Sequence, residues 1–410
     1  MPAEVAVYHD VQERIEASVS AGVPKASRPR LSLLVTGILT AKSVVVAQMA
    51  SAIEQLEITR ATQEESVARR FRRALNDEHL QGQTCYAPAL AQVIDWTPFT
   101  TGAEPLLVLV DESSQTDAVH LFRVSLPYRG GALPLAWATW AQNTALPEGT
   151  YWREVDHVLA QVAALVPAGH PPIAVADGAY AIPSFVDRLG DLGWPWIVRV
   201  RLAGSHRLRD ERGQEWALSA FVHQHLGRRG RWKGRVEVFK GAGWRSMSLV
   251  AVWAAGAEEP LVVLSDLPPD WTLLRHYDRR FWIEPSFRND KSRGWQWEAS
   301  QVQGAAHHAV LLLAMAWATL LTLCLGAVQA QRQLDRLDAR PLTPAPGRTR
   351  LGRPRHARAS LFTMGLRSLL QWPPPDVPFP WHLPHLTDLS WFRHWHRVQA
   401  WRYIFQPVRP

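Results

Sequence analysis

The amino-acid sequence predicts an α/β protein in which a mixed sheet forms the centre of the chain. Three observations predict this fold class: strand-length apolar runs between residues 105 and 201, helical patterns between these runs, and a mostly helical pattern over the first hundred residues. At 410 residues the chain is long enough for two or three domains and at least one substantial core.

The composition is that of a folded, basic protein. Hydrophobic residues make up 47% and charged residues 20%, which excludes a disordered chain. The formal net charge of +8 favours a polyanionic partner such as nucleic acid, or an anionic membrane surface. Cys85 and Cys324 lie too far apart for a Cys-rich zinc site or a disulfide framework, and the first residues lack the pattern of a secretory signal. We therefore expect a cytoplasmic protein.

Residues 1–100 are predicted to form a helical N-terminal DNA-binding region. An apolar stretch covers residues 31–53, and a basic amphipathic helix is predicted at 67–80. Its basic side chains surround Phe71 and Leu75: Arg69, Arg70, Arg72 and Arg73. Four arginines within five residues fit either contacts to DNA phosphates or a solvated helix face, and both interpretations stay open.

The centre of the chain alternates between strand and helix patterns. The run "PLLVLVD" at 105–111 is continuously apolar and ends in a carboxylate, as buried central strands do. The predicted elements that follow are strands at 118–126 and 132–140, a helix at 151–166, a strand at 171–177, a helix at 181–193 and a strand at 194–201. This is the order of a ribonuclease-H-like domain, and in such mixed sheets ligands collect at the carboxyl ends of strands.

Residues 202–270 are predicted to be a β-rich insertion that divides the catalytic domain into 101–201 and 271–330. Short β-like runs at 235–239, 247–254 and 260–266 are separated by Gly-rich and basic turns. Between residues 199 and 240 there are eleven Lys or Arg against four Asp or Glu, so the insertion also presents a basic face.

An apolar helix and a basic tail follow the catalytic domain. Ala309 to Val328 contains no charge over twenty residues, which is enough to span a bilayer. We favour a buried helix and no membrane partner, because small residues are frequent and no second segment of similar quality exists. Residues 331–410 are predicted to be a basic Pro-rich linker and a Trp/His-rich tail. We interpret the tail histidines as packing or phosphate contacts rather than metal ligands: His382, His385, His394 and His396.

Three carboxylates are candidates for chemistry. Asp111 and Asp177 each end a hydrophobic strand, where an ionised carboxylate is costly unless it is paired or binds a metal. With Glu284 they would complete a site for two Mg²⁺ ions, roughly 3.5–4 Å apart, which is suited to in-line attack on phosphodiesters. Glu112 rivals Asp111, but as its neighbour it would point to the opposite face of the strand. Either aspartate could instead be a turn former.

The stretch "YDRRFWIEPSFRNDKSRGW" (277–295) surrounds the third carboxylate with phosphate-binding side chains. On a helix, Tyr277, Arg280 and Lys291 would share a face with Glu284, within an arc of roughly 60°. An arginine offers a forked contact, a lysine a point charge and a tyrosine a hydrogen bond or a stacking surface. Pro285 requires the helix either to kink or to begin at that position.

These residues resemble the Y-x2-R-x3-E-x6-K motif of a large group of bacterial insertion-sequence DDE transposases. "VLVDES" and "VADGAY" resemble the family's two aspartate regions, and the resemblance covers roughly residues 100–325, including the place of a β-insertion. It implies that Asp111, Asp177 and Glu284 coordinate two Mg²⁺ or Mn²⁺ ions per active site. It further implies that Tyr277, Arg280 and Lys291 hold the phosphates of the transposon ends.

The resemblance also implies a reaction and its partners. We expect a homodimer in the bacterial nucleoid that binds double-stranded terminal inverted repeats, cleaves the ends and joins the 3′ ends to target DNA. Some relatives stack a tryptophan of the insertion on a flipped base; Trp244 and Trp253 are candidates, with a role in the β-core as the alternative. Two other functions stay open: a ribonuclease-H-like nuclease or domesticated transposase-derived protein, and a non-enzymatic DNA-binding or membrane-anchored protein.

Overall fold

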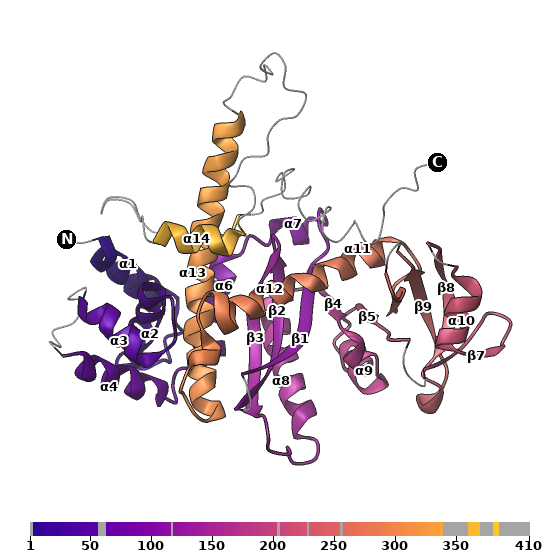
Figure 1. The fold of residues 1–410 in the computed structure, drawn as a ribbon, viewed down its shortest axis with the longest axis horizontal. Coiled ribbons are helices and arrows are strands. Elements are labelled where there is room, and N and C mark those ends of the chain that lie inside the picture. The colour runs from indigo at the N-terminus through magenta and orange to yellow at the C-terminus, as the bar shows by residue number, and fades with distance from the viewer. Residues whose placement is uncertain are drawn as a thin grey trace.

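The computed structural model describes residues 3–55, 63–115, 118–202, 206–227, 229–254, 257–338, 360–369 and 380–384. Within these ranges a ten-stranded sheet runs through the molecule and carries helices on both faces (Figure 1). The fold is therefore mixed α/β, with one large sheet and many helices, as the sequence predicts.

The N-terminal region is helical. Its elements are α1 (Ala3–Ser18), α2 (Ser27–Ala41), α3 (Val46–Gln55), α4 (Glu64–Leu75), α5 (Gly82–Cys85), α6 (Ala87–Val93) and α7 (Thr97–Thr100). The apolar stretch 31–53 forms two helices, because Lys42 has a left-handed backbone (φ 51°) that ends α2. The predicted basic helix ends at Leu75, earlier than expected, where the side-chain amide of Asn76 donates a hydrogen bond to the carbonyl of Arg72.

The sheet combines antiparallel and parallel pairings. Its strands are β1 (Leu107–Gln115), β2 (Val119–Tyr128), β3 (Gly131–Ala141), β4 (Ile173–Ala176), β5 (Trp196–Arg199), β6 (Arg207–Arg209), β7 (Glu215–Ala217), β8 (Arg231–Val238), β9 (Arg245–Val252) and β10 (Leu261–Ser265). Their order is β3-β2-β1-β4-β5-β10-β9-β8-β6-β7. Strand β2 is antiparallel to both β1 and β3, whereas β4 is parallel to both β1 and β5.

Helices cover the two faces of the sheet differently. Helix α8 (Thr150–Leu165) follows β3, and α9 (Pro183–Asp191) lies between β4 and β5, in the predicted order. On the other face, a helical segment crosses the strands from β10 and β5 to β1 and β3 (Figure 1). This crossing segment consists of α11 (Thr272–Asp278), the 3₁₀ turn η3 (Arg279–Trp282), α12 (Ile283–Arg288) and the π turn η4 (Asn289–Arg293).

The strands of residues 202–270 extend the same sheet. Strand β10 pairs antiparallel with β5 and with β9, so the β-rich region joins the sheet at its edge (Figure 1). The other short elements of this part are α10 (Leu218–His225) and the turn η2 (Lys240–Ala242). Two further turns lie outside it: η1 (Gly178–Tyr180), between β4 and α9, and η5 (Trp297–Ala299), before α13.

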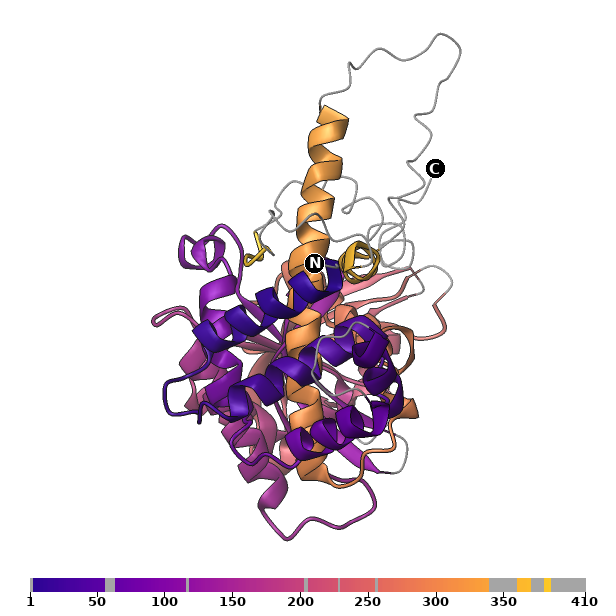
Figure 2. The same cartoon turned by 90° about the vertical axis from the view of Figure 1, so that its left-hand side faces the viewer.

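The apolar segment 309–328 lies inside helix α13 (Ala305–Asp338), which crosses the molecule beside β3. Its most apolar window is 94% buried, and the N-terminal helices pack against it (Figure 2). Within the described ranges this helix has the length and composition of a membrane span. The bent pair α2 and α3, which meet at 88°, passes the same test only if it is counted as one span.

Two C-terminal pieces return to the body of the protein. Helix α14 (Leu361–Leu369) crosses α13 (Figure 1), and the segment 380–384 places Leu383 in a parallel bridge with Ile94. In that segment His382 is exposed. Most of the predicted linker and tail, including His385, His394 and His396, lies outside the described residues.

Candidate active site

Asp111 lies on β1, and Asp177 directly follows the neighbouring parallel strand β4, at the equivalent position. The last paired residues of β1 and β4 are Val110 and Ala176, and each aspartate is the next residue of its chain. Because adjacent strands are about 4.8 Å apart, the backbone pairing itself brings the two carboxylates together. This pairing explains why apolar runs ending in a carboxylate occur twice in the sequence.

The expectation that Asp111 ends its strand is wrong. Strand β1 continues to Gln115, because β2 supplies a partner for every residue from Leu109 onward, with Asp111 directly opposite Arg123. Burial raises the pKa of Asp111 to about 6; Arg280 opposes the rise, and the negative charge of Asp177 adds to it. The two aspartates are therefore close enough to repel each other.

Asp177 also has a local structural role. Its Oδ1 accepts a hydrogen bond from the backbone N–H of Ala179 at 2.9 Å, so it caps the turn η1. Its Oδ2 lies 3.6 Å from Nη2 of Arg201. The turn-forming interpretation and the catalytic interpretation of this residue are thus compatible.

Arg280 connects Asp111 to Glu284. Its Nη2 lies 2.9 Å from Oδ2 of Asp111, and its Nη1 lies 2.7 Å from Oε1 of Glu284. The guanidinium is largely buried, whereas the side chain of Glu284 is 49% exposed. The crossing segment therefore delivers Glu284 to the edge of the site occupied by the two aspartates.

The three carboxylates do not share a single ion site in this arrangement. Among the described residues, no group of three His, Cys, Asp or Glu side chains is close enough to hold a metal ion. The guanidinium of Arg280 lies between two of them. The chemistry of the donors nevertheless fits Mg²⁺ or Mn²⁺, since all three are carboxylates and the burial of Asp111 penalises its uncompensated charge.

The crossing segment is not one regular helix. Pro285 lies in the first turn of α12, where its missing N–H removes no hydrogen bond, and a 3₁₀ turn precedes it. A π turn then carries Lys291, whose Nζ lies 3.8 Å from Glu298. These changes of helix type break the single-face geometry expected for Tyr277, Arg280, Glu284 and Lys291.

Tyr277 lies beneath the site rather than on its surface. The residue is 1% exposed, and its ring packs edge-on against Phe281 at 5.9 Å. Burial raises the pKa of its hydroxyl to about 12, with Arg280 opposing and both aspartates adding smaller contributions. In this structure the ring offers no exposed surface for stacking on DNA.

Arg123, which no sequence motif singled out, anchors the crossing segment to the sheet. Its Nη1 lies 2.5 Å from Oδ2 of Asp290, its Nη2 donates to Oγ of Ser286 at 3.0 Å, and its Cζ lies 4.1 Å from the ring centre of Phe287. All three partners follow Glu284 in the chain. The available signal was an arginine within the apolar strand pattern "AVHLFRVSL".

Glu112 points away from the aspartates, as its position next to Asp111 predicts. It contacts His120 and Tyr151 on the face of the sheet that carries α8. Glu112 is held by these contacts, and Asp111 is the carboxylate of β1 that contacts Arg280.

The other predicted DNA-binding residues lie apart from this site. The four arginines of α4 are exposed, and Arg69 and Arg72 pair with Glu65. In the β-rich region, the guanidinium of Arg209 lies 4.4 Å from the ring centre of Trp244, and the indole of Trp253 donates to the carbonyl of Ala257. Helix α4 and this region occupy opposite ends of the molecule (Figure 1).

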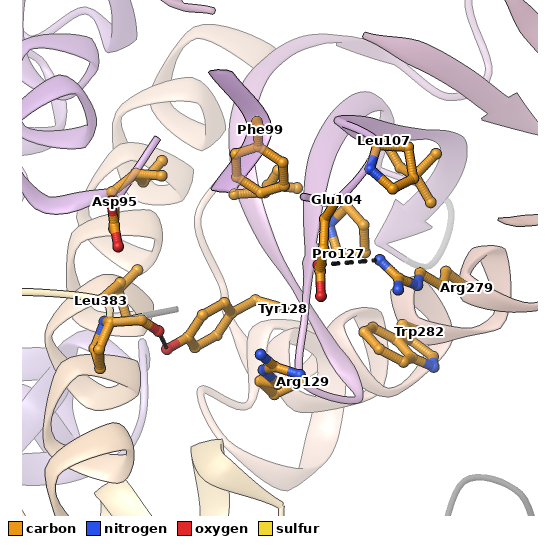
Figure 3. Close-up of a pocket in the computed structure, with 14 residues that line it drawn as sticks. Asp95, Phe99, Glu104, Leu107, Pro127, Tyr128, Arg129, Arg279, Trp282 and Leu383 are labelled. Atoms are coloured by element: carbon orange, nitrogen blue, oxygen red, sulfur yellow. Dashed lines mark hydrogen bonds and ion pairs between the residues drawn. The ribbon is translucent and has the colours of Figure 1, made fainter. Parts of the chain in front are cut away.

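A pocket lies next to the crossing segment. Its wall includes Phe99, Tyr128 and Trp282, and the segment 380–384 contributes Leu383 to its lining (Figure 3). An ion pair between Arg279 and Glu104, at 3.8 Å, crosses one side. Arg279 and Trp282, which line the pocket, flank Arg280 in the turn η3.

Comparison with known proteins identifies part of the chain. Residues 149–321 match the family model described as "Transposase DDE domain". The match confirms the predicted resemblance to DDE transposases; it includes Asp177 and Glu284, whereas Asp111 precedes it, and the narrower motif group is not tested. Among solved structures, a piggyBac transposase synaptic complex with hairpin DNA is similar, with a TM-score of 0.41 and 9% identity over 99% of this chain and 84% of that chain. No curated protein sequence matches significantly.

Proposed function

We propose that the protein binds the terminal inverted repeats of an insertion sequence, cleaves the DNA ends and joins the 3′ ends to target DNA. The match of residues 149–321 to the model described as "Transposase DDE domain" supports this proposal. The observation that carries this proposal is the placement of Asp111 on β1 beside Asp177, which directly follows the adjacent parallel strand β4, with Glu284 linked to Asp111 through Arg280.

The proposed catalytic domain is ribonuclease-H-like. The strand order β3-β2-β1-β4-β5, with two antiparallel pairings followed by two parallel ones, supports this assignment. We assign residues 101–201 and 271–330 to this domain, 202–270 to the β-rich insertion, and 1–100 to a DNA-binding region. The tail 331–410 has no assigned role.

We propose that Asp111, Asp177 and Glu284 hold two divalent cations, Mg²⁺ or Mn²⁺. When bound, such cations activate an attacking water or 3′-hydroxyl and stabilise the leaving oxygen. The β1–β4 pairing brings the two aspartates next to each other, and the buried contacts of Arg123 hold α12, which carries Glu284, over the sheet.

We propose a role for Arg280 both before and after DNA binds. Without DNA it neutralises Asp111 and Glu284, which would otherwise repel each other. With DNA present, its forked donors suit a phosphate at the scissile bond, and Lys291 adds a second positive charge. Tyr277 reaches DNA only after the side chains that bury it move apart.

The exposed arginines of α4 are proposed to contact DNA backbone at one end of the molecule, and Trp244 or Trp253 to stack on a flipped base at the other. Two such distant surfaces suit a homodimer that holds two DNA ends, acting on nucleoid DNA in the cytoplasm. The basic net charge of +8 supports this partner.

Cleavage and joining of DNA carrying the element's ends test the proposal. We expect Mg²⁺-dependent nicking by the wild-type protein and loss of at least about 10³-fold in rate for Asp177→Asn and Glu284→Gln, with DNA binding retained. Asp191→Asn, an exposed aspartate at the end of α9, is the matched control and should cut normally. Undiminished cleavage by Glu284→Gln overturns the proposed centre, and cleavage without joining of a pre-cut 3′ end indicates a nuclease instead.

A further inference from the structure

A hydrogen-bonded cluster lies on the face of the sheet opposite Asp111, with Glu112 at its centre. The Oε1 atom of Glu112 accepts hydrogen bonds from the hydroxyl groups of Tyr151 at 2.6 Å and Tyr180 at 2.9 Å. Its Oε2 lies 2.6 Å from Nε2 of His120, whose other ring nitrogen lies 3.0 Å from Oε1 of Gln142. Four separate parts of the chain therefore meet at one carboxylate.

Three side chains hold the half-buried carboxylate of Glu112 in place: His120 approaches one of its oxygens, and Tyr151 and Tyr180 approach the other. The geometry around Glu112 is thus fixed by its partners.

One of these hydrogen bonds joins the two segments that carry the aspartates. Glu112 follows Asp111 on β1, and Tyr180 ends the turn η1 that Asp177 caps. The backbone pairing of β1 with β4 stops at Val110 and Ala176. Beyond this point no β1–β4 ladder bond holds the segments together, and the bond from Tyr180 to Glu112 spans them from the far side of the sheet.

Tyr151 binds the same oxygen from a different element. It belongs to α8, which lies between β3 and β4 in the chain and carries neither aspartate. The two tyrosines therefore make the same kind of hydrogen bond to Glu112. Only the bond from Tyr180 connects the segment that carries Asp177 to β1. Tyr180 is additionally held by packing of its ring on Phe185, at 4.6 Å between ring centres.

We propose that the hydrogen bond between Tyr180 and Glu112 sets the separation of Asp111 and Asp177. Tyr180 and Glu112 are then positioning residues for the cation site. This inference rests on the proposed function, because it presumes that the two aspartates share a divalent cation. Tyr151 stabilises Glu112 without fixing that separation.

The test compares Tyr180→Phe with Tyr151→Phe in the full-length protein. Each change removes one hydroxyl and keeps the ring, so both should lower the melting temperature to a similar extent in metal-free buffer. Binding of Mn²⁺ is measured by electron paramagnetic resonance without DNA, and the Mg²⁺ concentration for half-maximal DNA nicking is measured separately. We expect Tyr180→Phe to weaken Mn²⁺ binding about 10-fold or more and Tyr151→Phe to change it less than about 3-fold.

The outcomes separate this inference from the function on which it rests. Equal effects of the two variants on Mn²⁺ binding, or no effect of Tyr180→Phe, overturn the positioning role. Wild-type protein that binds no Mn²⁺, or Asp177→Asn protein that binds it as the wild type does, contradicts the metal centre and therefore the proposed function itself.

Discussion

Arg123 and Asp290 form an ion pair that is almost completely removed from water. Their side chains are 3% and 5% exposed, and the pair connects β2 to the π turn behind Glu284. Burial raises the pKa of Asp290, and the guanidinium of Arg123 opposes that rise. Loss of either partner would leave a buried charge without compensation, which is the most damaging change to such a pair.

We therefore expect Arg123→Met to lower the free energy of unfolding by about 3–5 kcal/mol. Arg245→Met is the control: it removes an ion pair with the exposed Asp187 and should cost less than about 1 kcal/mol. Urea-induced unfolding of both variants measures the difference. A cost for Arg123→Met no larger than that of the control contradicts the anchoring role.

His120 makes the stability of the protein depend on pH. The hydrogen bond to Glu112 raises the pKa of His120 above its ordinary value of 6.5, against the effect of burial. The stabilisation is fully present below about pH 6.5 and is lost as the pH rises through the raised pKa, because the folded protein keeps the proton longer than the unfolded chain does.

We expect the free energy of unfolding of the wild-type protein to fall above pH 6.5. A single proton contributes at most about 1.4 kcal/mol per pH unit to this fall, and His120→Gln should make the fall smaller. Unfolding measured from pH 6 to pH 9 for both proteins tests this. Parallel pH profiles would show that His120 carries no proton-linked stability.

At the scale of elements, α13 and α14 cross in close backbone contact. A Cβ added at Gly365 would lie 1.9 Å from the carbonyl oxygen of Thr322, and one added at Gly326 would lie 2.1 Å from that of Leu361. No side chain fits at either position unless the helices separate. The close contact of α14 with the core therefore depends on these two glycines.

Gly365→Ala should destabilise the protein by about 1–3 kcal/mol, because an inserted methyl group forces the two helices apart. Gly190→Ala is the matched control, since that helical glycine in α9 has open space around it and alanine favours helix by up to about 1 kcal/mol. Thermal unfolding compares the two variants. Equal stability of the two would mean that α14 does not pack as described.

The sequence predicts regular elements well and their junctions poorly. Apolar runs located β1, β2 and β3, and periodicity located α8, because local patterns determine these elements. The continuation of β1 past Asp111 depends on pairing with β2, which no local pattern contains. The motif at 277–295 identified the side chains of the crossing segment but not its 3₁₀ and π turns.

The sequence likewise predicted some residues of the candidate site and not others. Residue type and spacing selected Asp111, Asp177, Glu284 and Arg280. The structure places the two aspartates side by side and joins Asp111 to Glu284 through Arg280, while their catalytic role stays a prediction. Arg123 was not selected although it interrupts an apolar strand pattern, and the partners of Glu112 were not singled out either: their contacts follow from the pairing and packing of β1, β2, α8, η1 and η4. Such contacts exist only after the sheet has formed.

At the scale of the whole molecule, α13 is the central packing element. The N-terminal helices, β3 and α14 surround it, and the indole of Trp295 donates a hydrogen bond to Thr319 in its interior (Figures 1 and 2). With 94% of its apolar window already buried, little apolar surface is left for lipid.

We therefore expect the full-length protein to be recovered in the soluble fraction of a cell lysate without detergent. Salt must be high enough to release it from DNA, because the basic charge favours that association. Recovery only after detergent extraction, at the same salt concentration, would indicate that α13 contacts a membrane.

Crystals soaked with Mn²⁺ test the central claim most directly, because anomalous scattering locates the ion without reference to activity. We predict a peak in contact with the carboxylates of both Asp111 and Asp177, together with release of Glu284 from Arg280. Ordered Mn²⁺ elsewhere, with these two aspartates unligated and Arg280 still bridging Asp111 and Glu284, would contradict the account.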